Sequence, residues 1–272
     1  MTSYCRAALN YVGGDGLSGA PSPIEVDVRN GRVDPLPDWT ECGFQRFDHR
    51  SGVQDWTDDE EIAAVHYPEA EALARQLTGL DHALVADHVK RNAETTKRRR
   101  EQEPVRLVHS DFAANYGDVV RSNYRNVHGR GAAALARAGL SGDDVADAER
   151  IVMLQLWRTL GAPLRDLPVA WCDARTVTCA EARPFRYTGY VAGADPFDAL
   201  AIVAPSDPAR HHWYAYPSLT DEEVVVFRTY DTELVSVGAT HFTPHSAFRD
   251  PAVAPGAAAR FSIELRVMCL SL

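Results

Sequence analysis

The sequence predicts a mainly β protein with flanking helices, of the antiparallel sandwich or jelly-roll type. Short alternating or apolar stretches recur along all 272 residues and are separated by Pro, Gly and Asp turns. That pattern is typical of many short antiparallel strands. A smaller helical portion follows Asp58, where acidic residues precede apolar residues at helical spacing. There is no internal repeat and no long linker, so we expect one domain over residues 1–272.

Each expected strand depends on apolar or β-branched content and on turn residues at its ends. The clearest alternation is Ile24-Glu25-Val26-Asp27-Val28, which precedes an Asn-Gly turn at 30–31. In chain order we predict strands at residues 5–12, 24–28, 44–49, 84–89, 105–108, 151–157, 169–173, 185–191, 200–204, 212–216, 223–230 and 259–270.

Three helical regions are expected between these strands. The first begins after Asp58 and is divided by Pro68 into a short helix and a longer one, because proline disrupts a helix interior. The others cover residues 132–138 and 143–150, and Ser141 is the N-cap expected for the second of these.

Residues 90–103 carry six basic side chains and no apolar residue larger than Ala. Such charge runs usually face water, so a solvated loop is the favoured interpretation. The alternative is a lid over a functional site, because binding loops often move to enclose a ligand.

The composition excludes several classes of protein. The hydrophobic share of 45% and the charged share of 24% are those of a soluble globular protein. The net charge of −10 disfavours nucleic acid and anionic membranes as partners. Five scattered cysteines form no CxxC pair, and no signal peptide or membrane span is visible, so we predict a cytoplasmic protein. The oligomeric state cannot be read from the sequence, and the Ala- and Arg-rich composition favours a GC-rich bacterial source.

The stretch that organises the chain is Pro104-Val105-Arg106-Leu107-Val108-His109-Ser110-Asp111-Phe112. If the strand continues through it, His109 and Asp111 lie on one face, since alternate strand residues point the same way. A His and a carboxylate so placed can hold a metal ion, but two ligands do not complete a site. His245, 136 residues further along the chain, is the best third candidate. Two imidazoles and one carboxylate form the triad of non-haem Fe(II) oxygenases.

Two further residues point to a dicarboxylate co-substrate. Arg260 and Ser262 are two apart, so on a strand they would share a face. A guanidinium next to the metal could bind a carboxylate in bidentate fashion.

Several segments, in this order and at this spacing, resemble the CmcJ/NvfI-type oxidoreductases, which include gibberellin desaturase-like and AsaB-like proteins. The resemblance runs through most of the chain. The segments that carry it include Asn10-Tyr11, Tyr67-Pro68-Glu69, Val108-His109-Ser110-Asp111, Leu156-Trp157-Arg158, Pro168-Val169-Ala170-Trp171, Pro244-His245-Ser246-Ala247-Phe248 and Arg260-Phe261-Ser262.

This resemblance implies a double-stranded β-helix core, a jelly-roll or cupin-like fold. It also implies Fe(II) as the metal, 2-oxoglutarate and O2 as co-substrates, and a small-molecule substrate in secondary metabolism. By position, His109, Asp111 and His245 would be the iron ligands, and Arg260 and Ser262 would bind the distal carboxylate of 2-oxoglutarate.

Other polar residues have competing interpretations. His241 is the rival third ligand, and Arg266 is the rival of Arg260, although a structural ion pair suits Arg266 better. Arg158 follows a buried strand, where it could pair with Asp173 or bind a carboxylate of substrate or co-substrate. His211 and His212 are a poor metal pair, because adjacent strand residues face opposite ways.

The predicted activity is therefore oxidation of a C–H bond by hydroxylation, desaturation or ring closure, with the substrate left open. Two other classes remain possible. An oxidase of the same fold would use O2 without 2-oxoglutarate, and Arg260 would then bind the substrate. A non-redox cupin-like binding protein would hold a structural metal and consume no O2.

Overall fold

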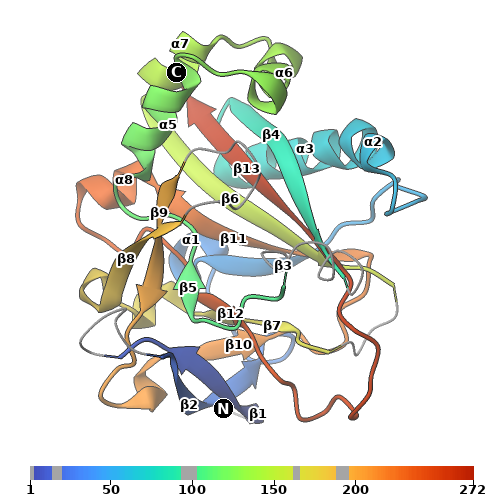
Figure 1. Ribbon diagram of the computed structural model, residues 1–272, viewed down its shortest axis with the longest axis vertical. Coiled ribbons are helices and arrows are strands. Elements are labelled where there is room, and N and C mark those ends of the chain that lie inside the picture. The colour runs from blue at the N-terminus through green and yellow to red at the C-terminus, as the bar shows by residue number, and fades with distance from the viewer. Residues whose placement is uncertain (1–2, 14–19, 93–102, 162–165, 188–195) are drawn as a thin grey trace.

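The computed structural model describes residues 3–13, 20–92, 103–161, 166–187 and 196–272. Two sheets face each other, as Figure 1 shows. The larger has the order β1 (Ser3–Tyr11), β2 (Ser22–Asn30), β10 (Trp213–Ala215), β7 (Val169–Cys172), β12 (His245–Ala247), β5 (His109–Ser110), β9 (Phe197–Ile202), β8 (Ala182–Tyr187). The smaller has the order β3 (Phe44–Asp48), β11 (Glu223–Asp231), β6 (Arg150–Thr159), β13 (Ser262–Ser271), β4 (His82–Arg91). The β2–β10 pair is parallel, and the other strand pairs are antiparallel.

Aromatic side chains fill part of the space between the sheets. Trp157 and Phe227 come from the smaller sheet and meet Trp171 of the larger one, with ring centroids 5.8 Å and 6.0 Å apart. All three rings are buried. Such packing of two inner faces defines a sandwich, and the predicted mainly β, jelly-roll class is confirmed.

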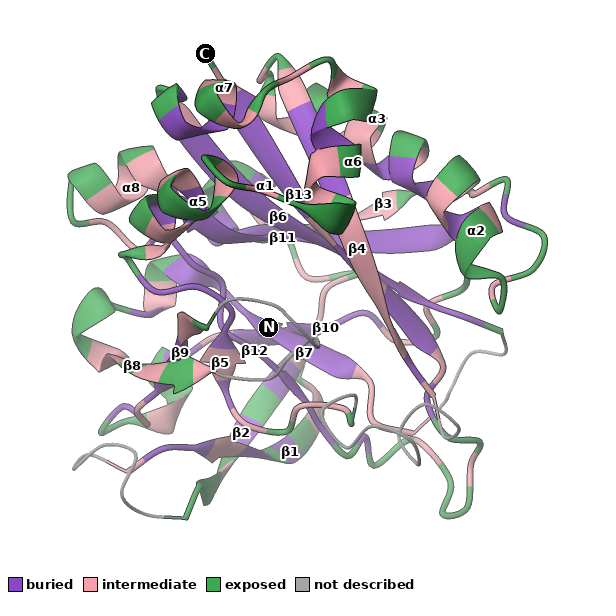
Figure 2. Ribbon diagram, turned by 45° about the horizontal axis from the view of Figure 1, so that its top comes forward, coloured by how far each residue is buried: buried purple, intermediate pink, exposed green. Residues whose placement is uncertain are grey.

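Helices cover the outer face and one end of the smaller sheet (Figure 2). On that face, Leu154, Leu156 and Leu265 share one apolar cluster with Ile62 and Ala70 of the helical region. This region comprises α2 (Asp59–Glu61), a π-helical turn η1 (Ile62–His66) and α3 (Tyr67–Thr78). The other helices are α1 (Trp39–Cys42), α5 (Tyr116–Tyr124), α6 (Gly129–Ala138), α7 (Gly142–Asp147), α8 (Thr232–Ser236) and the 3-10 turns η3 (Ala174–Thr176), η4 (Cys179–Glu181) and η5 (Pro208–Arg210).

The helix boundaries predicted from the sequence are partly confirmed. Pro68 does mark a boundary, but the chain stays helical across it, because a proline is tolerated in the first turn of α3. Ser141 caps α7 in a capping box with Asp144. The helix expected over 143–150 ends at Asp147, because Arg150 already pairs in β6. Helices α1, α5 and α8 were not predicted.

Three strand predictions need correction. The stretch 105–108 contributes only an isolated bridge at Leu107, and β5 is two residues long. β4 continues through Lys90 to Arg91, where we expected a basic loop to begin, while 93–102 lie outside the described residues. β8 begins three residues before the expected 185–191, and positions 188–191 are likewise outside the described residues. β12, which supplies His245, was not predicted as a strand.

Candidate metal centre and its pocket

The structure brings His109, Asp111 and His245 together. Their ligand atoms all lie within 4.8 Å of one another, and the two imidazole centroids are 4.3 Å apart. The sheet register explains the meeting, since His245 of β12 is the cross-strand partner of His109 of β5. Paired residues of an antiparallel ladder point to the same face. Among the described residues this is the one group of three or more His, Cys, Asp or Glu side chains arranged to hold a metal.

Backbone carbonyls orient both imidazoles. Nδ1 of His109 lies 2.8 Å from the carbonyl oxygen of Leu107, and Nδ1 of His245 lies 3.1 Å from that of Thr243. These contacts place the proton on Nδ1 and leave Nε2 as the ligand atom, as in many metal sites. Burial lowers the pKa of His109 and lowers that of His245 to about 4, so both rings are neutral at pH 7. Neutral imidazole is the form that binds a metal.

Asp111 completes the group from just beyond the strand. β5 ends at Ser110, so the prediction that His109 and Asp111 share a strand face is wrong in its geometry, although the two side chains do meet. Oδ1 of Asp111 lies 3.9 Å from Nε2 of His109. Its other oxygen, Oδ2, accepts a hydrogen bond of 3.2 Å from Nε of Arg266. The carboxylate is thus held from one side and presented to the imidazoles from the other.

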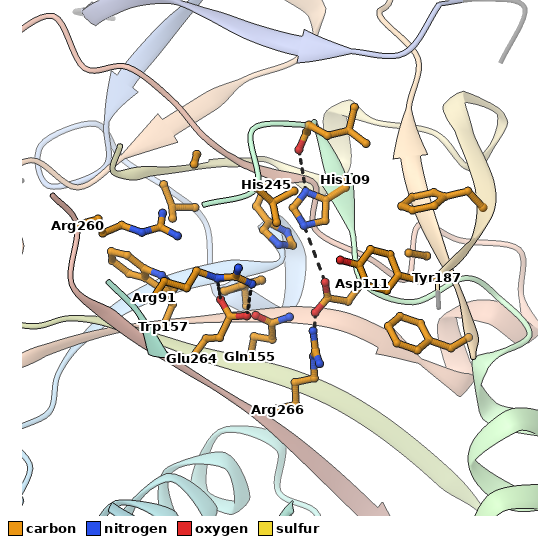
Figure 3. Close-up of a pocket in the computed structure, with 18 residues that line it drawn as sticks. Arg91, His109, Asp111, Gln155, Trp157, Tyr187, His245, Arg260, Glu264 and Arg266 are labelled. Carbon is orange, nitrogen blue, oxygen red and sulfur yellow. Dashed lines mark hydrogen bonds and ion pairs between the residues drawn. The ribbon is translucent and has the colours of Figure 1, made fainter. Parts of the chain in front are cut away.

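The three side chains open into a cavity of about 150 Å³ between the inner faces of the two sheets (Figure 3). Alternate residues of a strand point to the same face, and this alternation decides which residues line the cavity. The lining residues include Gln155 and Trp157 of β6 and Glu264 and Arg266 of β13. The remaining lining residues are mostly apolar or aromatic: Val105, Leu107, Val169, Phe185, Tyr187, Phe197, Ala199, Phe227 and Ala247, with Arg91 and Arg260.

Arg260 lies at one end of this cavity (Figure 3). It is 6% exposed, and its Nη1 donates a hydrogen bond of 2.9 Å to the carbonyl of Leu167. Its guanidinium packs 5.7 Å from the ring centroid of Trp157, and its Nε has no partner among the described residues. Burial lowers the pKa of Arg260 to about 9, so it still carries its charge at pH 7. A buried cation with unused donors is suited to an anionic ligand.

Ser262 does not share a strand with Arg260, because β13 begins at Ser262 itself. Its side chain is buried and lies on the face of β13 that also carries Glu264 and Arg266. That face is the one turned to the cavity. Ser262 is not among the residues that line the cavity, so its place is beside the cavity wall.

The prediction that Arg158 could bind a carboxylate of substrate or co-substrate is wrong. Arg158 follows Trp157 on β6 and therefore points to the opposite face, away from the cavity. Its Nη1 donates to the carbonyls of His49, at 2.7 Å, and of Asp221, and its Nη2 lies 2.8 Å from Nδ1 of His49. The alternative pairing with Asp173 is also wrong, since that carboxylate binds Arg175.

The other histidine candidates lie outside the triad. His241 is buried against the rings of Tyr230 and Phe242. His211 accepts or donates a hydrogen bond of 3.0 Å with the hydroxyl of Tyr11, so it does not form a metal pair with His212. Arg266 does form the ion pair expected for it, and the partner proves to be Asp111.

Sequence reasoning missed a second ion pair in the cavity, between Arg91 and Glu264. Nη2 of Arg91 lies 2.8 Å from Oε1 of Glu264, and both side chains are largely buried. Arg91 was counted in a basic loop, yet it continues the alternation of β4 into the cavity. The available signal was the polar alternation of Glu264 and Arg266 with Ile263, Leu265 and Val267, which implies a polar inner surface.

Fold and site together define a jelly-roll protein with a two-histidine, one-carboxylate triad in a buried cavity. Over residues 18–270 the chain matches the family described as oxidoreductase/YMDC permease-like domain, and it belongs to that family. Within the described residues, no helix is long and apolar enough to cross a membrane.

Individual relatives agree with the resemblance to the NvfI type. The chain is 25% identical over 205 residues to the Fe(II)/2-oxoglutarate-dependent dioxygenase nvfI of Aspergillus novofumigatus, a match that spans 75% of this chain and 65% of that protein. Three solved structures of the iron and alpha-ketoglutarate-dependent endoperoxidase NvfI share the fold. A single-residue variant has a TM-score of 0.77 at 19% identity and covers 100% of this chain and 98% of its own. A structure of NvfI in a different conformation has a TM-score of 0.75 at 20% identity and covers 100% of this chain and 99% of its own. A third structure has a TM-score of 0.73 at 19% identity and covers 99% of this chain and 98% of its own.

Proposed function

We propose that this protein is a non-haem Fe(II)/2-oxoglutarate-dependent oxygenase, with residues 1–272 as one catalytic domain. Its substrate would be a small natural-product precursor, oxidised at a C–H bond in bacterial secondary metabolism. The observation that carries the proposal is the position of Arg260 in the same cavity as the triad, as a buried guanidinium that pairs with no carboxylate among the described residues. The name of the curated relative supports both the metal and the co-substrate.

The residues present fit an iron ion. His109 and His245 would each offer Nε2, and Asp111 would offer the oxygen that faces them. Three protein ligands on one side leave other positions open for small molecules. Bound iron would supply oxidation of a substrate C–H bond by O2, coupled to conversion of 2-oxoglutarate to succinate and CO2.

The chain's own residues would position the reactants and exclude water. Arg260 would bind the distal carboxylate of 2-oxoglutarate through its unused donors, with Ser262 beside it at the start of β13. The apolar lining from Val169, Ala247 and Phe227 would keep bulk water from the reaction. Arg266 would hold Asp111 in place from behind.

The test is an anaerobic titration of the metal-free protein with Fe(II), then with 2-oxoglutarate, observed through the visible charge-transfer band of an iron-chelated 2-oxo acid. We expect a band in the parent protein, none in His109→Ala, and at least tenfold weaker 2-oxoglutarate binding in Arg260→Ala. Arg6→Ala is the matched control, because Arg6 is a mostly exposed arginine on β1.

Each other outcome selects a different function. Iron binding without a band at any 2-oxoglutarate concentration would overturn the proposed co-substrate and favour the oxidase that uses O2 alone. Absence of iron binding would favour the non-redox binding protein. Succinate formation and O2 consumption with substrate mixtures separate the three functions independently.

A further inference from the structure

Three aromatic side chains stand together on the inner face of the larger sheet, at the other end of the cavity from Arg260. Phe185 and Tyr187 belong to β8, and Phe197 belongs to β9. All three line the cavity, and we call them the aromatic wall. Figure 3 shows Tyr187 on the far side of Asp111 from Arg260.

The sheet register fixes the wall on the same face as the metal ligands. Tyr187 is the cross-strand partner of Phe197, and Phe185 is the partner of Ala199. On β9, Ala199 is two residues before Ala201, which pairs with His109 of β5. Because cross-strand partners and alternate residues share a face, the wall and His109 face the same space.

The rings of the wall pack on one another, and Phe185 is the ring with a small residue opposite it. The centroids of Tyr187 and Phe197 are 5.8 Å apart in a stacked arrangement, and those of Phe185 and Tyr187 are 6.1 Å apart, edge to face. The partner of Phe185 is a small, buried alanine, so within the described part of β8 and β9 no large side chain lies opposite that ring. All three aromatic residues are only half-buried, although they line a cavity. Partly exposed rings in a pocket are surfaces on which a flat ligand can stack.

Apart from Arg260, the charged side chains that line the cavity are paired with one another. Arg266 binds Asp111, and Arg91 binds Glu264 within the same cavity. The wall itself adds no charged side chain. Burying a charged ligand group against it without a partner would be unfavourable, whereas a neutral ring gains from burial and stacking.

We propose that the aromatic wall binds the substrate and selects a molecule that presents a flat, uncharged ring system to it. This inference rests on the proposed oxygenase function, because only that function makes the bound ligand a substrate. The aromatic wall itself is present without the metal. It assigns the two ends of the cavity to different ligands, since Arg260 takes a carboxylate and the wall takes a ring.

The test uses three probes, namely 2-naphthol as a neutral ring, 2-naphthoate as the same ring with a charge, and n-decanol as a neutral chain. Binding is measured by probe fluorescence or calorimetry on the metal-free protein and again with anaerobic Fe(II) and 2-oxoglutarate. We expect 2-naphthol to bind tightest in the loaded protein. Phe185→Ala should weaken its binding by about tenfold, because a lost stacking contact of this size corresponds to about 1.4 kcal/mol.

Two variants keep the test independent of folding. Phe47→Ala is the matched control, since Phe47 of β3 packs against the apolar cluster on the outer side of the smaller sheet, and it should leave 2-naphthol binding unchanged. Ala199→Leu adds a side chain opposite Phe185 and should weaken 2-naphthol binding by filling that space.

In the loaded protein, tighter binding of 2-naphthoate or n-decanol than of 2-naphthol would overturn the inference, as would an unchanged affinity in Phe185→Ala. The outcome separates from that of the proposed function. Ring binding without a charge-transfer band would retain the wall and reject the 2-oxoglutarate site. A band without ring binding would do the reverse.

Discussion

The molecule contains two clusters with the same composition, each with two histidines, one carboxylate and one arginine. The first is His109, His245, Asp111 and Arg266 in the cavity. The second is His49, His66, Glu69 and Arg158 on the outer side of β6. In the second cluster Nδ1 of His66 lies 3.1 Å from Glu69, and Nδ1 of His49 lies 2.8 Å from Arg158.

The difference lies in the partners of the ring nitrogens. In the cavity, backbone carbonyls hold each Nδ1, and the Nε2 atoms converge on a carboxylate. In the second cluster the side chains bind one another, and Arg158 is fully buried on two carbonyl oxygens. Residue types alone therefore do not distinguish the two clusters, whereas the partners of the ring nitrogens and the position beside a cavity do.

The largest expected difference is in metal affinity. His245→Ala removes a ligand and should lower Co(II) affinity by more than about 100-fold. This loss is larger than that expected when a residue hydrogen-bonded to a ligand is changed. His66→Ala should leave Co(II) affinity unchanged while lowering the free energy of unfolding by about 2 kcal/mol, since Glu69 loses a buried partner. Calorimetric titration and denaturant unfolding measure the two quantities. A fall in Co(II) affinity in His66→Ala would contradict the separation of the clusters.

Substitution of the two buried arginines should affect different properties, the stability of the fold for Arg158 and the binding of 2-oxoglutarate for Arg260. Arg158→Met leaves the carbonyls of His49 and Asp221 without their donor, so we expect a loss of about 3 kcal/mol of stability. Arg260→Met removes one hydrogen bond and an incompletely paired cation, so stability should change by less than about 1 kcal/mol. Only Arg260→Met should lose 2-oxoglutarate binding. Urea unfolding and the charge-transfer titration read out both effects, and equal destabilisation would contradict the comparison.

The second cluster also predicts a pH dependence of stability. Burial lowers the pKa of His66 to about 4, despite the opposing effect of Glu69. As pH falls from about 6.5 to about 4, the unfolded chain takes up a proton at this position before the folded protein does, so stability decreases. The shift corresponds to as much as about 3 kcal/mol. His66→Gln should reduce the slope of the unfolding free energy over this range, and identical slopes would contradict the role of His66.

The smallest expected effect concerns Arg266. Arg266→Gln removes the guanidinium that donates to Oδ2 of Asp111, and we expect Co(II) affinity to fall by about tenfold. Arg137→Gln is a control, since Arg137 pairs with Glu71 and Val85 instead. The measurement is the Co(II) visible spectrum during titration. An unchanged Co(II) affinity in Arg266→Gln would mean that Asp111 needs no support from this side.

Residue type, local motif and the family resemblance selected His109, Asp111 and His245, and the structure brings these three side chains together. Sequence reasoning failed for Arg158 and Arg91 for a common physical reason. Whether a polar side chain enters a cavity depends on the face of its strand, and the face depends on where the strand ends. Trp157, which lines the cavity, and Arg158, which does not, are consecutive residues on β6.

The long strands were predictable from alternation, whereas β5 and β12 were not. Each is only two or three residues long, and their pairing is decided by neighbours far away in the sequence. The aromatic wall was missed for the same reason, since Phe185 and Phe197 become neighbours of His109 only through the pairing of β8, β9 and β5.

The cross-strand pairing of His109 with His245 has a consequence for folding kinetics. These two ligands are far apart in the sequence, so their pairing closes a long loop, and other contacts of the sheet must offset the entropy lost in closing it. A slip of one residue in this pairing would turn an imidazole to the opposite face. A metal ion bound by both imidazoles would therefore report that β12 has paired with β5 in the native register.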